Sequence, residues 1–165
     1  MKKSGFSKPI YADWLAKKKA KTRSVKPKIP SKKKVSKKKV QSVSKLKKQL
    51  WEECKRIVRK TYAKEDGTWE CFTCGRRIDE PFKAQTGHFL PSSTCGAYLR
   101  YDLRNLRIQD YFCNINLGGN GAEYYKRLVQ TCGQKYVDQL FLDKQKTIKA
   151  DTDWYLKKIE EYKLL

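Results

Sequence analysis

The chain has 165 residues, and its 39 Lys and Arg outnumber 17 Asp and Glu to give a net charge of +22. This length fits one domain of ordinary size with an extension. No run approaches the roughly 18 consecutive apolar residues of a membrane helix, and no apolar stretch follows the first lysines as in a secretory signal. We expect a cytoplasmic protein whose partner is a polyanion, with nucleic acid the first choice.

The charge excess lies at the start of the chain. Residues 1–48 hold 19 basic residues and one acidic residue, a net charge of +18. Repulsion between like charges and scarce apolar surface predict that residues 1–43 form a largely disordered tail, which contacts phosphate without sequence preference. A localisation signal is the alternative. A small apolar cluster in this segment either packs on the domain or docks a partner; it comprises Phe6, Ile10, Tyr11, Trp14 and Leu15.

Residues 44–165 are predicted to form the folded domain. Apolar residues at three- and four-residue steps, including Leu46, Leu50 and Cys54, predict a helix over 44–64 with Ser44 as its N-cap. Cys54 lies on the apolar stripe and is therefore expected in the core. The segment 68–130 contains short strands, with extended pieces at 84–90 and 98–108. Helical periodicity returns before Gly133 and again within 133–163, where Asp151 or Thr152 caps the last helix.

The motif Cys71-x-x-Cys74 followed by Gly75 predicts a metal site. Two residues between thiolates allow both sulfurs to reach one ion, and glycine permits the turn that follows. A thioredoxin-like redox pair is the rival, although that motif opens a helix. Structural zinc takes four ligands, and Asp110-x-x-Cys113 offers a second pair. Other candidates for the remaining ligand are Cys95, Cys132 or water.

His88 is the only histidine. It follows the cysteine pair, while Asn105 lies on the next extended piece and Asn114 directly follows Cys113. This order is typical of an HNH nuclease. The chain resembles the phage NinG/Rap recombination endonucleases over about residues 70–165. The likeness is carried by Cys71–Gly75, Gly87–Phe89, Leu99–Leu106, Gln109–Asn114, Gly119-Asn120, Gly133–Asp138, and Tyr155, Ile159 and Tyr162.

The resemblance implies an α+β fold with a small, zinc-stapled ββα-metal (HNH-like) core flanked by helices. It also implies that His88 is the general base and that Asn105 holds the loop bearing it. The catalytic Mg²⁺ or Mn²⁺ would be bound by Asn114 and Asn116. The family tends to have cysteine at position 110 and histidine at 116, and many HNH enzymes have an acid where this chain has Gly87.

Basic residues around Asn105 and after the glycines are predicted to contact phosphate: Arg100, Arg104, Arg107, Lys126 and Arg127. On an extended segment, 100 and 104 would share a face and 107 would point away. The aromatic residues Tyr98, Tyr101, Tyr111 and Phe112 are expected in the core.

We therefore expect a structure-selective DNA endonuclease that hydrolyses phosphodiester bonds in branched recombination intermediates, such as Holliday junctions and D-loops. A homodimer would supply two active sites for paired cuts, and phage or host recombination proteins are candidate partners in the cytoplasm of the infected bacterium. The main alternative is a non-catalytic zinc-knuckle protein that binds nucleic acid. A weaker alternative is a basic recruiter that uses residues 6–15.

Overall fold

The computed structural model describes residues 41–165. The predictions for the basic tail up to residue 40 and for the apolar cluster at 6–15 lie outside the described residues. The elements, in chain order, are α2 (Val43–Tyr62), β1 (Trp69–Glu70), β2 (Arg77–Ile78), β3 (Ala84–His88), α3 (Ala97–Arg100), a 3-10 turn (Leu103–Asn105), β4 (Leu106–Asp110), a π-helical turn (Phe112–Asn116), α4 (Gly121–Cys132), α5 (Gln134–Lys144) and α6 (Thr152–Lys163). The predicted mixture of helices and small sheets is confirmed.

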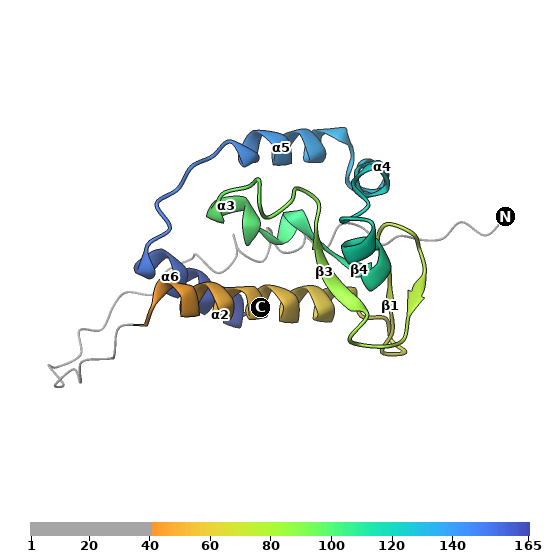
Figure 1. The fold of residues 1–165 in the computed structure, drawn as a ribbon, viewed down its shortest axis with the longest axis horizontal. Helices are drawn as coiled ribbons and strands as arrows, with labels where there is room; N and C mark the ends of the chain where they lie inside the picture. Colours follow the sequence, from red (N-terminus) through yellow and green to blue (C-terminus); the bar gives the residue numbers. More distant parts are fainter. Residues whose placement is uncertain (1–40) are drawn as a thin grey trace, which may run out of the picture.

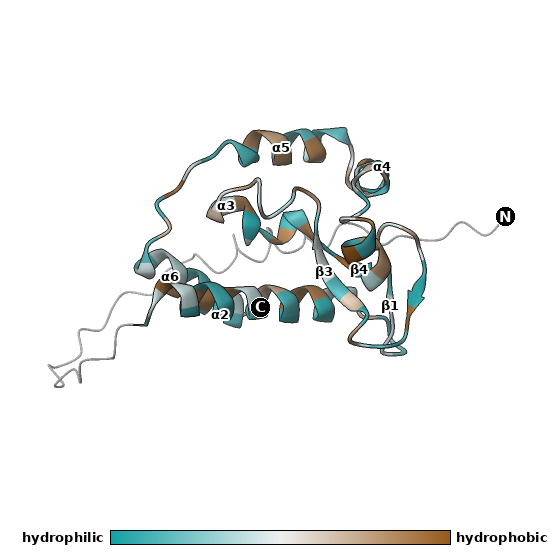
Figure 2. Cartoon of the chain, in the orientation of Figure 1, coloured by the Kyte–Doolittle hydropathy of each residue, from teal (hydrophilic) through white to brown (hydrophobic). Residues whose placement is uncertain are grey.

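The elements form three layers (Figure 1). Helices α2 and α6 lie on one side, β3, β4 and α3 occupy the middle, and α4 and α5 cover the other side. Each gap between layers holds an apolar cluster. The first contains Leu46, Leu50, Ile108, Tyr155 and Ile159, and the second contains Leu99, Tyr124, Leu128, Val137 and Leu140. Along α2 and α5, hydrophilic and hydrophobic residues alternate (Figure 2), as a helix with one buried face requires.

Helix α2 forms where the spacing predicts it. Leu46, Leu50 and Cys54 are fully buried, which confirms the predicted stripe and the core position of Cys54. The N-cap is Ser42 rather than the predicted Ser44, because the Ser42 hydroxyl accepts a hydrogen bond from the Lys45 N–H at 3.4 Å. Both serines precede the apolar stripe closely, so spacing alone did not distinguish them.

Strands β3 and β4 form an antiparallel pair in which His88 lies opposite Leu106 and Ala84 opposite Asp110. Residues 84–88 are extended, as predicted. The extended prediction for 98–108 is wrong before Leu106, since this stretch contains α3 and the 3-10 turn. The Asp102 carboxylate caps that turn by accepting from the Arg104 N–H at 2.9 Å.

The C-terminal helices follow the predicted signals. Helix α4 ends before Gly133, whose φ of +85° is a conformation that glycine adopts without strain. Asp151 caps α6 by accepting from the Trp154 N–H at 3.0 Å. Helix α6 lies beside α2, where Arg56 donates to the Tyr162 carbonyl at 2.8 Å. Within residues 41–165, none of the helices has the length and apolar character needed to cross a bilayer.

Candidate metal centre and active site

A tight turn between β1 and β2 brings Cys71 and Cys74 together. The Cys71 N–H donates to the Arg76 carbonyl at 2.8 Å, and the Gly75 N–H donates to the Cys71 carbonyl at 2.9 Å. Gly75 has a φ of +73°, so a side chain there would be strained. The next hydrogen bond, from the Phe72 N–H to the Ile108 carbonyl at 2.8 Å, attaches the turn to β4.

Cys113, in the turn after β4, completes a group of three cysteines. The sulfur atoms of Cys71, Cys74 and Cys113 all lie within 4.8 Å of one another. Bonds of about 2.3 Å from zinc to sulfur are compatible with that spacing, so the three thiolates can hold a metal ion such as Zn²⁺.

The protonation of these thiols depends on their surroundings. Burial acts to raise the pKa of Cys71, but hydrogen bonds from the Thr73 hydroxyl and from nearby backbone N–H groups outweigh burial and lower it. Burial raises the pKa of Cys74 to about 12, and its hydrogen bonds to the other two sulfurs add to this. The Cys71 sulfur is therefore the first of these two to carry the negative charge that a metal ligand needs.

The predicted ligand Asp110 does not join this group. Its carboxylate accepts a hydrogen bond from the Phe112 N–H at 2.7 Å, while its backbone N–H acts on the Cys71 sulfur. Cys95 donates to the Leu90 carbonyl at 3.8 Å, and Cys132 accepts from Arg107 at 3.7 Å. Among residues 41–165, no further Cys, His, Asp or Glu joins the three sulfurs, which leaves water as the remaining candidate named above.

His88 lies at the end of β3 with its ring fixed on two sides. The ring stacks on Trp51 of α2, with centroids 5.0 Å apart and planes inclined by 11°. Its Nε2 lies 3.0 Å from the Arg100 carbonyl oxygen. Because a carbonyl oxygen can only accept, Nε2 carries the hydrogen, and neutral His88 keeps the lone pair of Nδ1 for another proton.

The surroundings of His88 also favour its neutral form. Burial lowers the pKa of His88 below 6.5. The positive charge of Arg100 also lowers this pKa, whereas the hydrogen bond to the Arg100 backbone raises it. A histidine with a lowered pKa is neutral at pH 7 and can accept a proton.

Asn105 is fully buried and connects the segment after His88 to α3. Its side chain accepts from the Leu90 N–H at 2.8 Å, donates to the Leu90 carbonyl at 3.0 Å, and donates to the Leu99 carbonyl at 3.4 Å. These are the contacts that a residue holding the loop after His88 would make.

Two amide oxygens meet beside Gly87. A methyl group at residue 87 would lie 1.8 Å from Gln109 Oε1 and 3.1 Å from Asn114 Oδ1. The side-chain NH₂ of Gln109 donates to the Gly119 carbonyl at 2.7 Å, which fixes the direction of Oε1, and this buried oxygen has no hydrogen-bond partner. Mg²⁺ binds amide oxygens and keeps several waters. These oxygens offer two ligands for a divalent ion, on the face of the β3–β4 pair opposite the His88 ring, because Gly87 and His88 are successive strand residues.

Asn116 does not share this position. It is exposed and lines a surface hollow together with Asp110 and Tyr111, and Asn114 does not line that hollow. Residues two apart on a helical turn do not face each other. The two side chains have different surroundings, and the expectation that both hold one ion stays a prediction.

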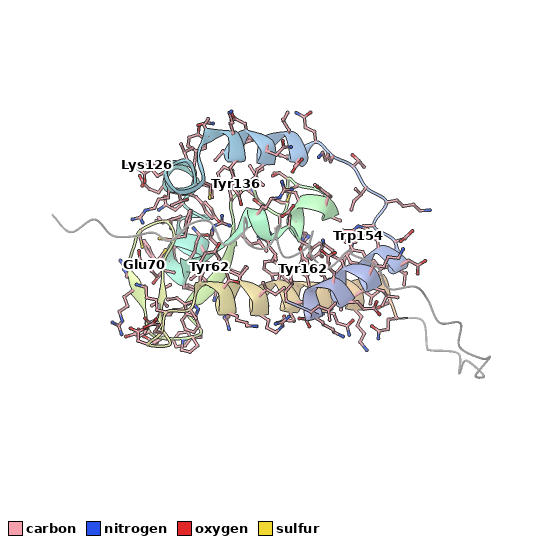
Figure 3. The ribbon with its side chains drawn as sticks, turned by 180° about the vertical axis from the view of Figure 1, so that it is seen from behind. Tyr62, Glu70, Lys126, Tyr136, Trp154 and Tyr162 are labelled. Atoms are coloured by element: carbon pink, nitrogen blue, oxygen red, sulfur yellow. The ribbon has the colours of Figure 1, made fainter. Side chains whose placement is uncertain are left out.

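Two predicted phosphate contacts are also corrected. Arg107 is buried, donates to the Leu106 carbonyl at 2.7 Å, and lies over the Tyr62 ring at 5.6 Å. Figure 3 labels Tyr62 and Tyr136, and the Tyr136 hydroxyl also contacts Arg107 at 3.3 Å. Arg104 is paired with Asp102 and Asp143, each at 2.6 Å. The helical turns before β4 and the pairing of the strands direct these guanidiniums inward.

The other predicted basic residues remain accessible. Arg100 is exposed, and its guanidinium lies 5.8 Å from the centre of the Tyr101 ring. Lys126 extends from the outer side of α4 (Figure 3), and its side chain is 63 % exposed. Arg127 Nη2 lies close to Gly75 of the cysteine turn. Their contact with phosphate stays a prediction.

Sequence reasoning missed the roles of two side chains. Trp51 forms part of the apolar pattern of α2, and nothing in the sequence indicates that it meets His88. Gln109 belongs to the stretch on which the family resemblance rests. The direction of its side-chain oxygen depends on the Gly119 carbonyl, which reaches Gln109 only because the chain folds back after β4.

The sequence was compared with known families, curated proteins and solved structures. The sequence model of the family described as Bacteriophage Lambda NinG protein matches residues 5–165. No curated protein and no solved structure matches. The matched range covers nearly all of the chain, the cysteine turn and the β3–β4 pair included. The chain therefore belongs to the Bacteriophage Lambda NinG protein family.

Proposed function

We propose that this protein is a metal-dependent DNA endonuclease of the HNH type that cuts branched recombination intermediates. The observation that carries the proposal is the state of His88, a neutral imidazole whose Nε2–H is held by the Arg100 carbonyl and whose Nδ1 is left as a base. The two amide oxygens beside Gly87 offer ligands for a divalent ion at the neighbouring residue of β3.

In this mechanism, His88 Nδ1 takes a proton from a water molecule, and the resulting hydroxide attacks phosphorus. The bond from phosphorus to the leaving sugar oxygen breaks, and that oxygen carries away the electron pair before it takes up a proton. The hydrogen bond to the Arg100 carbonyl stabilises the imidazolium that forms, while stacking on Trp51 keeps the ring in place. General base catalysis of this kind contributes about 10²–10⁴-fold.

Asn114 and Gln109 are the residues that would hold the catalytic ion. A bound Mg²⁺ or Mn²⁺ supplies positive charge that neutralises the phosphate and the leaving oxygen. Cys113 directly precedes Asn114, so zinc at the three cysteines would also fix the backbone of the metal-binding residue.

The substrate proposal comes from the family resemblance and from charge. Branched DNA would be held by the basic segment of the chain and by Arg100, Lys126 and Arg127. The setting would be recombination in the cytoplasm of the infected bacterium, with phage or host recombination proteins as candidate partners. A second copy of the chain would permit paired cuts across a junction.

The test is cleavage of four-way junctions, D-loops, flaps and linear duplexes by the full chain with Mg²⁺ or Mn²⁺. We expect His88→Ala to lower the nicking rate by about 10²–10⁴-fold, while the affinity for DNA changes less than about twofold. Gln130→Ala, an exposed polar change on α4, is the matched control.

Undiminished cutting by His88→Ala would refute the assignment of the base. Absence of product from the wild-type chain on every substrate, combined with tight binding, would favour the non-catalytic zinc-knuckle protein.

A further inference from the structure

The hollow that contains Asn116 has an unusual lining. Its volume is about 410 Å³, within the range of about 300–1,000 Å³ common for ligand sites. It lies between β2, the segment after it, and the π-helical turn. The lining residues used below are the aromatic Phe82, Tyr111 and Phe112, the basic Arg76, Arg77 and Lys83, and the polar Asp79, Asp110 and Asn116.

The aromatic residues are accessible, contrary to the expectation that Tyr111 and Phe112 belong to the core. Phe82 is 66 % exposed, Tyr111 48 % and Phe112 50 %. Ile115 and Leu117, which follow in the chain, are exposed as well. Exposed apolar groups gathered around a concave site mark a binding surface.

The basic residues identify the chemistry of the ligand. Arg76 and Arg77 are exposed, and Lys83 Nζ lies 5.6 Å from the centre of the Phe82 ring. Cations interleaved with exposed aromatic rings bind single-stranded nucleic acid, since bases stack on the rings and phosphates meet the cations. The side chains of Asp79 and Asn116 offer acceptors for the exocyclic amino groups of a base.

We propose that this hollow binds an unpaired nucleotide of single-stranded DNA, with the base stacked on Phe82, Tyr111 or Phe112 and the adjoining phosphates near Arg76 and Arg77. The inference rests on the proposed function in one respect, since branched DNA is the source of the unpaired nucleotide. The hollow and Asn114 share one helical turn. A base held here therefore positions the adjoining strand relative to the proposed catalytic ion.

The experiment uses the full, zinc-loaded chain without Mg²⁺ and a single-stranded oligonucleotide that carries one 2-aminopurine. At about 0.2 M salt, purely ionic contacts with phosphate are weakened. We expect binding to quench the 2-aminopurine fluorescence. Tyr111→Ala and Phe82→Ala should each weaken single-strand affinity about 5- to 30-fold, and their affinity for duplex DNA of equal length should change less than about twofold.

Two comparisons make the result specific. Tyr111→Trp keeps an aromatic surface and should retain both affinity and quenching. Leu142→Ala, which removes a 60 % exposed apolar side chain from α5, should behave as wild type. As a second readout, an oligonucleotide with 5-iodouracil should photo-crosslink to peptides from 76–83 or 110–117.

Wild-type single-strand affinity in both alanine variants, with crosslinks elsewhere, would overturn the proposal and favour a protein partner for this surface. Equal losses for single strands and duplexes would also overturn it. The catalytic proposal is tested separately. If His88→Ala loses cutting and Tyr111→Ala does not change single-strand binding, only the proposal for the hollow is rejected. If His88→Ala still cuts and Tyr111→Ala weakens single-strand binding, only the assignment of the catalytic base is rejected.

Discussion

The nitrogen of His88 that we propose as the proton acceptor is determined by residues that lie far from it in the chain. Arg100 follows on α3 and supplies the carbonyl that holds Nε2–H, while Trp51 precedes on α2 and supplies the stacking surface. The sequence shows that His88 is the only histidine, but these neighbours come from tertiary packing. The choice of Nδ1 as the base therefore required the structure.

The environment of His88 also gives a prediction on the pH dependence of the proposed cleavage. Burial lowers the pKa of His88 below its ordinary value of 6.5, so the neutral base persists as pH falls and is lost only below that value. We expect kcat/KM for nicking at constant Mg²⁺ to fall on the acidic side with a midpoint below 6.5. DNA binding measured over the same pH range is the control, and a midpoint above about 7 would contradict the assignment.

The orphaned oxygen of Gln109 gives a prediction about metal binding. Gln109→Leu removes Oε1 and should weaken Mn²⁺ binding about tenfold, as measured by electron paramagnetic resonance in the absence of DNA. Gln85 lies opposite Gln109 in the strand pair, so Gln85→Leu is the matched control and should leave Mn²⁺ affinity unchanged. Equal affinity of both variants would exclude Gln109 as a ligand.

The sequence correctly predicted the elements that are determined by residues close together in the chain, such as an apolar stripe, a capping side chain or a terminating glycine. The stripe of α2, the glycine after α4 and the Asp151 cap are of this kind. The segment 98–108 was mispredicted because its alternating side chains fit a strand, whereas the Asp102 cap and the burial of Leu99 favour helical turns. The direction of Arg104 was lost with that error, whereas the burial of Arg107 depends on the packing of β4 against the helices.

The cysteine turn gives a prediction at the scale of an element. Purified under reducing conditions, the chain should contain about one zinc ion at Cys71, Cys74 and Cys113. Cys113→Ser should release zinc to a colorimetric chelator and lower the melting temperature by about 5 °C or more. Asp110→Ala should keep its zinc, since that carboxylate contacts the Phe112 N–H instead.

The control for this measurement is Cys132→Ser, because Cys132 contacts Arg107 rather than the other thiols. Loss of zinc from Asp110→Ala with retention in Cys132→Ser would restore Asp110 as a ligand.

Across the whole molecule, Arg107 connects the layers. Its guanidinium contacts Tyr62 of α2, Tyr136 of α5 and Phe72 of the cysteine turn. Burial acts to lower the pKa of Arg107, but the nearby tyrosines, Tyr62 and Tyr136 among them, outweigh burial and raise it, so Arg107 stays charged. A sequence pattern cannot distinguish such an interior arginine from a phosphate-binding one.

Replacement of Arg107 by methionine should separate these two roles. We expect Arg107→Met to lower the free energy of unfolding by about 2–4 kcal/mol, because several backbone carbonyls and the Tyr136 hydroxyl lose a charged donor. Its DNA affinity should stay within about twofold of wild type. Urea unfolding and a salt series of DNA binding provide the measurements.

The comparison variant is Arg100→Met, which alters an exposed arginine. It should change the free energy of unfolding by less than about 0.5 kcal/mol and reduce the salt slope of DNA binding by about 1. A reversed pattern, with Arg107→Met altering the salt slope, would return Arg107 to the DNA interface.

The return of α6 to the side of α2 has a consequence during translation. The residues that form α6 leave the ribosome after every other described element, yet α6 covers the same apolar face of α2 whose Trp51 supports His88. A nascent chain that already contains the cysteines and His88 therefore lacks the packing of α6 that holds α2, and with it Trp51, against the His88 ring. On the proposed function, we expect polypeptides that end before α6 to bind DNA through the basic segment at the start of the chain but not to cut it.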